Sequence, residues 1–332
     1  MNGVERLAEA LRREGYGDRL LLNEPMARHT SFGIGGPADL FFEAREQEEL
    51  IRCVRLGWQM GVPVLILGGG TNVLVADRGV RGLVISNACA RFEVAPDGTL
   101  RVEAGKPLAE LARWCVAQGW AGLQWAVGIP GTVGGAVVGN AGAYGGYMAD
   151  VVRAVKLLLP SGEVRGVSAE ALEFGYRTSA LKRQTGQPRR AVVLEATLAL
   201  EHGDPEALAR EAERVTELRT QRTPQGPCAG SMFKRTLQYP AGFLIEQAGL
   251  KGYRIGGAQV SPKHANFFMN VGGATAADVR ALMEKVQREV WLTFAQHLEP
   301  EVELVGDWEA EPFEAVHTLS ANGPQGEKRR SR

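Results

Sequence analysis

Residues 128–146 read GIPGTVGGAVVGNAGAYGG, and eight of these 19 residues are glycine. The segment carries no charge, and neither does the wider stretch from Trp114 to Ala149. A segment with so few side chains is typical of backbone that lies directly against a flat cofactor ring. Tight packing of small residues against a sheet would produce the same pattern. Pro130 and the many glycines are atypical of a membrane-spanning helix, which needs about 20 predominantly apolar residues.

A second glycine run lies upstream, where the apolar residues Val62–Leu67 lead into Gly68-Gly69-Gly70-Thr71-Asn72. This order predicts a strand and then a loop whose backbone N–H groups converge on an anion. The loop suits a pyrophosphate, although an ordinary glycine turn fits it equally well. Two such loops in one chain favour a dinucleotide cofactor. The run Gly33–Ala38 also resembles a dinucleotide fingerprint, but Pro37 inside it favours a simple turn.

Composition and spacing exclude several classes of function. The 332 residues allow two or three domains, at roughly 100–200 residues each. The 38 basic residues cancel the 38 acidic ones, which argues against a nucleic-acid or membrane surface. Neither glycine loop ends in Gly-Lys-Ser/Thr, which disfavours ATP hydrolysis. No histidine or cysteine pair has ligand spacing, so no metal is expected, and the four cysteines are expected to be reduced thiols of a cytoplasmic protein.

Periodicity predicts helices and strands without strict alternation, which favours an α+β fold over a doubly wound sheet. A hairpin is expected where Pro160-Ser161-Gly162 separates two apolar runs, and a capping box at Thr275 and Asp278 predicts a helix start. Helices are expected at 4–14, 45–60, 107–118, 204–222 and 275–298, and strands at 62–67, 151–159, 163–167, 191–200 and 301–305. The tail from Asp307 is expected to be mobile.

Further motifs follow one another along the chain. They are HTSFGIGGPA at 29–38, LGGGTN at 67–72, the block 128–145, FGYRTS at 174–179, AGSMFK at 229–234, LIEQAGLKG at 244–252, SPKHANF at 261–267 and EV at 301–302. In this order they resemble the UDP-N-acetylenolpyruvoylglucosamine reductases, also called UDP-N-acetylmuramate dehydrogenases. The resemblance covers about residues 20 to 306 and is specific because the motifs occur together.

The resemblance implies a vanillyl-alcohol-oxidase-type FAD-binding fold of two α+β subdomains, with an α+β substrate-binding domain. The expected boundaries are 1–85 for the first subdomain, 86–202 for the second, 203–298 for the substrate domain and 307–332 for the tail, with 299–306 possible as a return to the first. The implied reaction is NADPH-dependent reduction of UDP-N-acetylglucosamine enolpyruvate through noncovalent FAD, a cytoplasmic step of peptidoglycan precursor synthesis. No nucleic-acid or membrane partner is expected, and the chain is expected to be a monomer or a weak oligomer.

By the same resemblance, Arg177, Ser231 and Glu301 are the catalytic residues. Arg177 offers a fork of donors that suits the substrate carboxylate and its developing charge. Ser231 supplies the proton that follows hydride transfer, and Glu301 joins Arg177 at the carboxyl group. Glu299 is the residue that could be confused with Glu301, but the family glutamate directly precedes the valine.

Other contacts are carried over in the same way. Substrate contacts are expected from Arg177, Arg222, Lys234 and Tyr144. Cofactor contacts are expected from Gly68, Gly69, Gly70, Thr71, Asn72, Gly128, Gly131, Thr132, Gly134, Gly135, Asn140 and Ala141. The pair Arg235-Thr236 departs from the usual family pattern, which puts the phosphate or uridine contact there in doubt. Only 70 residues separate Ser231 from Glu301, as in the shorter family subtype that lacks an inserted tyrosine loop.

Two other functions compete with this one. An FAD-dependent oxidase of the same fold would often attach its flavin to a histidine beside the glycine loop, but Thr71 and Asn72 stand there. A non-catalytic nucleotide-binding module would explain the glycine loops but would leave Arg177, Ser231 and Glu301 without a role.

Overall fold

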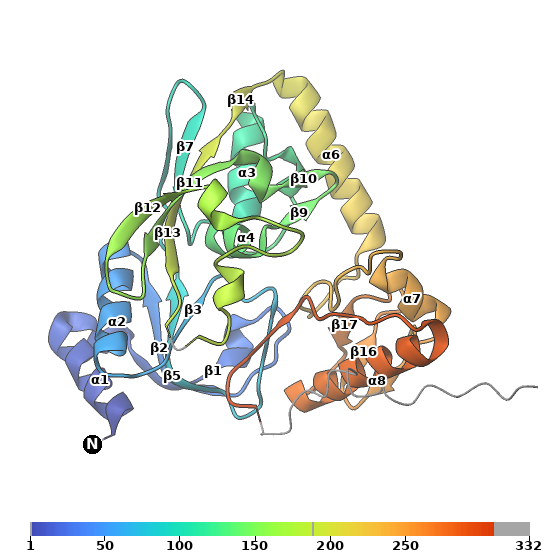
Figure 1. Cartoon of the computed structure of the whole chain (residues 1–332), viewed down its shortest axis with the longest axis horizontal. Coiled ribbons are helices and arrows are strands. Elements are labelled where there is room, and N and C mark those ends of the chain that lie inside the picture. The colour runs from blue at the N-terminus through green and yellow to red at the C-terminus, as the bar shows by residue number, and fades with distance from the viewer. Residues whose placement is uncertain (1, 188, 309–332) are drawn as a thin grey trace, which may run out of the picture.

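The computed structural model describes residues 2–187 and 189–308. Helices and strands mix as expected, and the α+β class is confirmed. Figure 1 shows two larger sheets beside each other, the first in blue and the second in green, with a smaller body of orange helices and strands to one side. The tail predicted to be mobile lies outside the described residues from position 309 onward. The boundaries at 85, 202 and 298 stay a prediction.

The first sheet has the order β1-β2-β5-β3. Strands β2 (Pro37–Ala44) and β3 (Val64–Leu67) each pair in parallel with the central β5 (Val80–Asn87), and β1 (Leu21–Pro25) closes the edge antiparallel to β2. Helices α1 (Gly3–Leu11) and α2 (Gln47–Gln59) pack on it through Leu7, Leu50 and other apolar side chains. The predicted helix 4–14 ends early at Leu11, and a π-helical turn with Gly15 at φ 87° follows.

The second sheet, β12-β11-β13-β7-β6, is antiparallel throughout. The predicted hairpin is confirmed, because β11 (Val152–Leu158) pairs with β12 (Val164–Ser168). The other strands are β13 (Val192–Ala199), β7 (Thr99–Glu103) and β6 (Phe92–Val94), and the apolar face is covered by α3 (Leu108–Ala117), α4 (Val133–Gly139) and α5 (Met148–Val151). Helix α4 was not predicted, because seven residues of glycine, alanine and valine carry no amphipathic pattern.

The third body has its own apolar core. It consists of α7 (Ala241–Gln247), α8 (Ala276–Phe294) and a sheet of β15 (Arg254–Ile255), β16 (Ala258–Val260) and β17 (Phe268–Asn270). The long helix α6 (Pro205–Arg222) leads into it from the second sheet (Figure 1). The capping box of Thr275 and Asp278 is confirmed, but α8 ends at Phe294 rather than 298, where Ala295 takes φ 52°.

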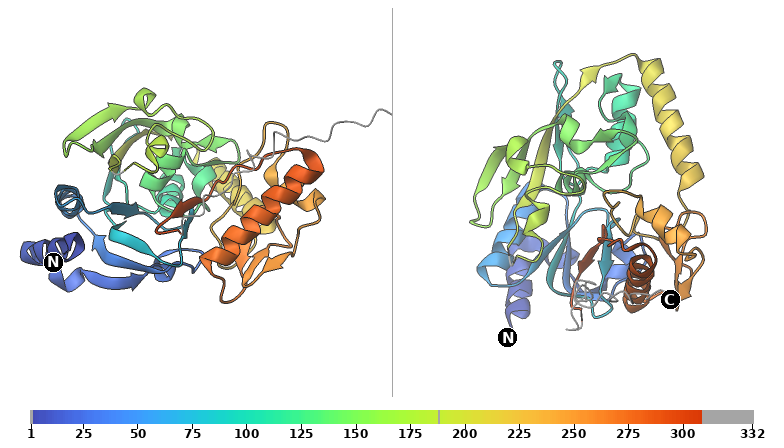
Figure 2. Two further views of the ribbon diagram at one scale, coloured as in Figure 1. Left: turned by 60° about the horizontal axis from the view of Figure 1, so that its bottom comes forward. Right: turned by 45° about the vertical axis from the view of Figure 1, so that its right-hand side comes forward.

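The chain end returns to the first sheet region. Strand β18 (Glu303–Val305) pairs in parallel with β4 (Val73–Val75), which directly follows the glycine loop 68–72. Figure 2 shows this dark red strand lying against the blue and cyan strands. Two segments more than 200 residues apart in the sequence thereby meet beside the glycine loop.

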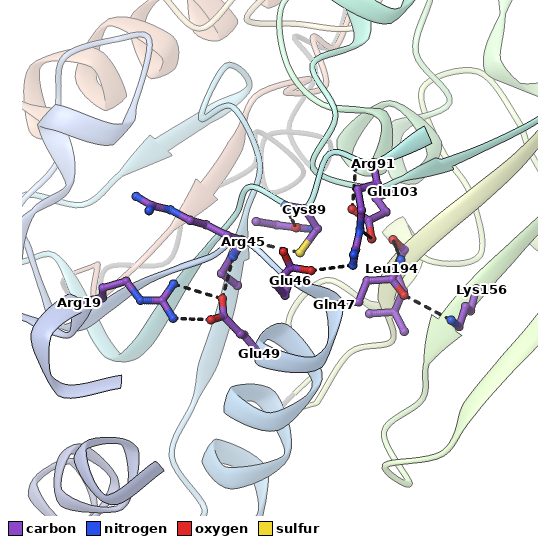
Figure 3. A network of polar contacts seen from close by, with 12 residues as sticks. Arg19, Arg45, Glu46, Gln47, Glu49, Cys89, Arg91, Glu103, Lys156 and Leu194 are labelled. Carbon is purple, nitrogen blue, oxygen red and sulfur yellow. Dashed lines mark hydrogen bonds and ion pairs between the residues drawn. The ribbon is translucent and has the colours of Figure 1, made fainter. Parts of the chain in front are cut away.

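A polar network at the start of α2 connects the first sheet with the second (Figure 3). Glu49 accepts hydrogen bonds from the Arg19 guanidinium and from the Arg45 backbone N–H, the latter at 3.0 Å. Gln47 donates to the Leu194 carbonyl at 3.5 Å and accepts from Lys156 Nζ at 3.3 Å, and both partners belong to the second sheet. The network therefore helps to set how the two sheets are placed on each other.

The Glu49 contacts predict a pH-dependent contribution to stability. Hydrogen bonds from Arg19 lower the pKa of Glu49 most, and burial opposes them. A carboxyl whose pKa is lowered on folding stabilises the protein above its unfolded pKa of about 4.3 and loses that contribution as pH falls through the folded pKa. We expect Glu49→Gln to lower the free energy of unfolding by about 1–3 kcal/mol at neutral pH.

Urea unfolding of wild type and variant at pH 7 and at pH 3.5 measures this difference, which should shrink at the lower pH. Glu48→Gln is the matched control, because Glu48 is exposed in the same first helical turn. An equal loss at both pH values would contradict the assigned role of the Glu49 carboxylate.

Candidate active site

Two cavities meet at three side chains. The first, about 410 Å³, lies between the two larger sheets and is lined by both glycine segments; we call it the glycine-lined cavity. The second, about 470 Å³, is lined largely by the third body; we call it the polar cavity. Among the residues that the structure describes, the three that line both cavities are Arg177, Ser231 and Glu301.

Arg177 lies at the tip of a tight turn. Gly175 and Thr178 pair with each other through both backbone N–H groups, at 3.0 and 3.2 Å, which places Tyr176 and Arg177 between them. Arg177 takes φ 54°, a left-handed conformation that costs a non-glycine residue of order 1–3 kcal/mol. Asn140 Nδ2 holds the turn by donating to the Gly175 carbonyl at 2.9 Å. Backbone strain that is retained in this way fits a side chain whose position matters for function.

Glu301 faces Arg177 from the segment before β18. Arg177 Nε lies 2.6 Å from Glu301 Oε1, an ion pair without the alignment of a hydrogen bond, and Arg177 Nη1 is buried without a partner within the described residues. Burial raises the pKa of Glu301, and Arg177 acts in the opposite direction. The Asn72 side chain donates to the Glu301 carbonyl at 3.1 Å, so the glycine loop directly supports this residue. The pair thus leaves donor capacity free for an incoming anion.

Ser231 is held in place by backbone pairing on two sides. It forms an isolated β-bridge with Phe267, and the next residue, Met232, accepts the Glu301 N–H at 2.8 Å. Asn266 pairs with both backbone groups of Phe233, at 3.0 and 2.8 Å. Gly230 takes φ 75°, which turns the chain into this position. The backbone of Ser231 is therefore held where the residue lines both cavities.

The glycine-lined cavity includes most of the residues expected to contact a cofactor. Those that line it are Gly68, Gly69, Gly70, Thr71, Asn72, Gly131, Thr132, Gly134, Gly135 and Ala141. Gly128 and Asn140 do not line it. Asn140 instead caps α4 at φ 44° and bonds to backbone groups, including the Ala149 N–H at 3.0 Å. Its contribution to the site is to hold the Arg177 turn.

The glycines that line this cavity differ in how close an added Cβ atom would come to neighbouring atoms. A Cβ on Gly134 would lie 2.9 Å from the Ala104 Cβ, so this glycine is required for packing α4 on the second sheet. A Cβ on Gly131 would lie 2.9 Å from Thr71 Oγ1, and Gly131 has φ 107°. A Cβ on Gly135 would lie no nearer than 3.7 Å to any neighbour outside its helix. Gly135 is therefore the best position for testing occupancy of the cavity.

If the glycine-lined cavity holds the flavin that the sequence predicts, Gly135→Val should lower the flavin content of the purified protein several-fold, because Gly135 lines the cavity and a Cβ there meets no near neighbour in the fold. The ratio of flavin to protein absorbance measures this. Gly166→Val is the matched control, since Gly166 lies on the exposed strand β12 and a Cβ there would meet nothing within 4 Å. Full flavin content in a folded Gly135→Val protein would contradict this assignment.

The polar cavity contains Arg235, whose substrate contact the sequence left in doubt, and further residues to which the sequence assigned no role. Arg235, Phe243, Lys263, His264 and Glu246 line it, together with Tyr176 and Asn266 among others. Lys263 Nζ donates to the Thr220 carbonyl at 2.8 Å. Burial lowers the pKa of His264, and its Nδ1 accepts the Asn266 N–H at 3.2 Å, so the neutral ring presents an Nε2–H donor. Lys263 and His264 belong to the SPKHANF motif, and this motif could have identified them as candidate site residues from the sequence.

Three residues expected to contact the substrate line neither cavity. Lys234 Nζ pairs with Glu299 Oε1 at 2.5 Å, and Arg222 is exposed at the end of α6. Tyr144 packs against the core of the second sheet with φ 52°. Their proposed contacts with substrate stay predictions. The pairing of Glu299 with Lys234 also separates it clearly from Glu301, which faces Arg177.

Comparison with known proteins shows which family the chain belongs to. A family described as UDP-N-acetylenolpyruvoylglucosamine reductase, C-terminal domain, matches residues 221–305, and an FAD binding domain family matches residues 38–168. The UDP-N-acetylenolpyruvoylglucosamine reductase of Alkaliphilus oremlandii is 44% identical over 87% of this chain and 94% of its own length. That of Rubrobacter xylanophilus is 46% identical over 86% and 95%. This chain belongs to the UDP-N-acetylenolpyruvoylglucosamine reductase family.

A solved member of the reductase family has the same fold. The crystal structure of the Thermus caldophilus enzyme superposes with a TM-score of 0.72 at 34% identity and covers 86% of this chain and 97% of its own. The resemblance and the FAD-binding fold expected from the sequence are thereby confirmed, and the chain is an enzyme of an oxidoreductase family with an FAD-binding domain. Within the described residues no helix is long and apolar enough to cross a membrane, and no group of His, Cys, Asp or Glu could hold a metal.

Proposed function

We propose that this protein reduces UDP-N-acetylglucosamine enolpyruvate to UDP-N-acetylmuramate, with NADPH as the hydride source and noncovalent FAD as the carrier. The observation that carries the proposal is the set of residues shared by the two cavities: Arg177, Ser231 and Glu301. A cofactor in the glycine-lined cavity and a substrate in the polar cavity would both reach these side chains. The product would serve peptidoglycan precursor synthesis in the cytoplasm.

The glycine-lined cavity fits FAD in shape and chemistry. Its loops carry almost no side-chain volume: a Cβ on Gly69 would lie 3.0 Å from the Gly131 Cα, so the two loops approach through bare backbone. Gly68–Gly70 with Thr71 offer backbone and hydroxyl donors that suit a pyrophosphate. No histidine or cysteine is among the described residues that line the cavity, which supports noncovalent binding. A flavin held by these residues would supply hydride transfer from NADPH to the substrate double bond.

Arg177 and Glu301 act on the substrate carboxylate. Hydride addition to the methylene carbon of an enolpyruvyl ether places negative charge on the carboxylate as an enolate. The unpartnered Nη1 of Arg177 is available to donate to that oxygen, where a preorganised donor contributes most. Glu301 acts at the same carboxyl group through Arg177, whose Nε lies 2.6 Å from Glu301 Oε1. Both residues then stabilise the enolate more than the ground state.

Ser231 completes the reaction by protonation. The enolate carbon is a strong base, so a serine hydroxyl is a sufficient acid. Ser231 lines both cavities, which supports its role as the residue that protonates this carbon. The β-bridge with Phe267 holds the backbone of Ser231 at this border. The proton moves from Ser231 Oγ to the carbon that bears the carboxylate.

Anaerobic stopped-flow absorbance tests the proposal in two half-reactions. NADPH should bleach the yellow flavin, and UDP-N-acetylglucosamine enolpyruvate should restore its colour without oxygen. Reoxidation by oxygen alone would indicate an oxidase, and a flavin that NADPH does not reduce would indicate a non-catalytic nucleotide-binding protein. Precipitation with trichloroacetic acid should leave the flavin in the supernatant, because noncovalent FAD is released on unfolding.

A further inference from the structure

Arg219 is a cation that lines the glycine-lined cavity from near the C-terminal end of α6. Within residues 2–187 and 189–308, no hydrogen bond or ion pair reaches its guanidinium. Burial lowers the pKa of Arg219, and no carboxylate is among the groups that act on it. A partly buried charge without a counter-ion is unfavourable, which suggests that the site is completed by an anionic ligand.

Two other arginines on the same helix, Arg210 and Arg214, are neutralised within the protein, and Arg222 at its end is exposed and lines neither cavity. Arg214 pairs with Glu211 through two contacts of 2.7 and 2.6 Å, and Arg210 lies 3.5 Å from Glu206. These side chains are exposed, whereas Arg219 is turned toward the cavity. The difference identifies Arg219 as the α6 arginine that lacks a protein partner within the described residues and lines the cavity.

The surroundings of Arg219 place it near the reacting end of the cavity. Its Cδ would lie 2.8 Å from a Cβ on Gly128, immediately before Ile129–Gly131. The Tyr144 hydroxyl and the Cys228 thiol are both close enough to raise the pKa of Arg219, against the larger effect of burial, and Cys228 leads directly into Ala229–Ser231, which line the same cavity. Because Ser231 borders the polar cavity, Arg219 faces the part of the cofactor that must approach the substrate. For a flavin, that part is the ring system and not the adenine.

We propose that Arg219 contacts the pyrimidine side of the bound flavin ring and stabilises the negative charge that the ring acquires on reduction. Hydride uptake adds two electrons and one proton, so the ring gains one negative charge, which is spread over N1 and the C2 oxygen. A fixed cation beside these atoms favours the reduced form and raises the reduction potential. This inference rests on the proposed flavin cofactor but is independent of the substrate's identity.

The test measures the two-electron potential of the flavin in the holoenzyme by equilibration with reference dyes. We expect Arg219→Gln to weaken binding of reduced flavin about tenfold more than binding of oxidised flavin, which equals a potential about 30 mV lower. Arg219→Lys keeps the charge and should retain most of the wild-type potential. Arg214→Gln is the matched control, because it removes one exposed positive charge from the same helix and should leave the potential unchanged.

The affinities for oxidised and for reduced FAD show whether Arg219 contacts the flavin ring or a phosphate of the cofactor. A phosphate carries the same charge in both states, so equal weakening of oxidised and reduced FAD would overturn the proposal, as would an unchanged potential in Arg219→Gln. A variant that loses flavin on purification is measured with added FAD. Failure of the proposed function itself would be visible separately, as wild-type protein that binds no flavin at all.

Discussion

Replacing Ser231 by alanine is expected to reduce turnover by about 10²–10⁴-fold, the contribution that a general acid typically makes. Binding of FAD and bleaching of the flavin by NADPH should change little, because the proton is needed only after hydride has reached the substrate. Ser231→Cys should recover part of the loss, since a thiol of similar size is a stronger acid. Steady-state turnover at saturating substrate and the rate of flavin bleaching measure these two effects separately.

Ser168→Ala is the matched control for the serine substitution, because Ser168 lies exposed at the end of β12 and lines neither cavity. If Ser231 merely positioned the substrate, Ser231→Ala would raise KM and leave kcat nearly intact. That outcome would show that the proton-donor role is wrong.

Replacing Arg177 by lysine is expected to slow the reduction of the enolpyruvyl substrate by about 10²–10³-fold, as the loss of one preorganised donor to an oxyanion does. Lysine keeps the charge beside Glu301 but loses the planar fork whose Nη1 is buried without a partner within the described residues. Bleaching of the flavin by NADPH should continue at nearly the wild-type rate. Single-turnover stopped-flow measurement of each half-reaction gives both rates.

Arg183→Lys provides the control for the arginine substitution. Arg183 follows on the same segment, is largely exposed, and pairs with Glu173 away from both cavities. If Arg177→Lys slowed both half-reactions equally, Arg177 would hold the flavin or the fold rather than the substrate carboxylate. Retained thermal stability together with a selective loss of the second half-reaction would support the role proposed here.

The family and the fold class could be predicted from the sequence because they depend on residue types that the local backbone conformation requires. Loops such as Gly68–Gly70 need residues without side chains wherever backbone approaches backbone, and the hairpin at Pro160–Gly162 needs particular turn residues. Amphipathic helices such as α2 and α6 were predicted nearly to their ends for the same reason. The short helix α4 was missed because small apolar residues show no periodic pattern.

The arrangement of the site was decided only by the tertiary structure. Pairing of β18 with β4 and the bond from Asn72 to the Glu301 carbonyl bring Glu301 to Arg177 across more than 100 residues of sequence. The same packing leaves Lys234 paired with Glu299 and turns Arg219 into the glycine-lined cavity without a protein partner within the described residues. Residue type determines which charges a chain carries, but burial and distance determine which of them are neutralised within the protein and which remain available to a ligand.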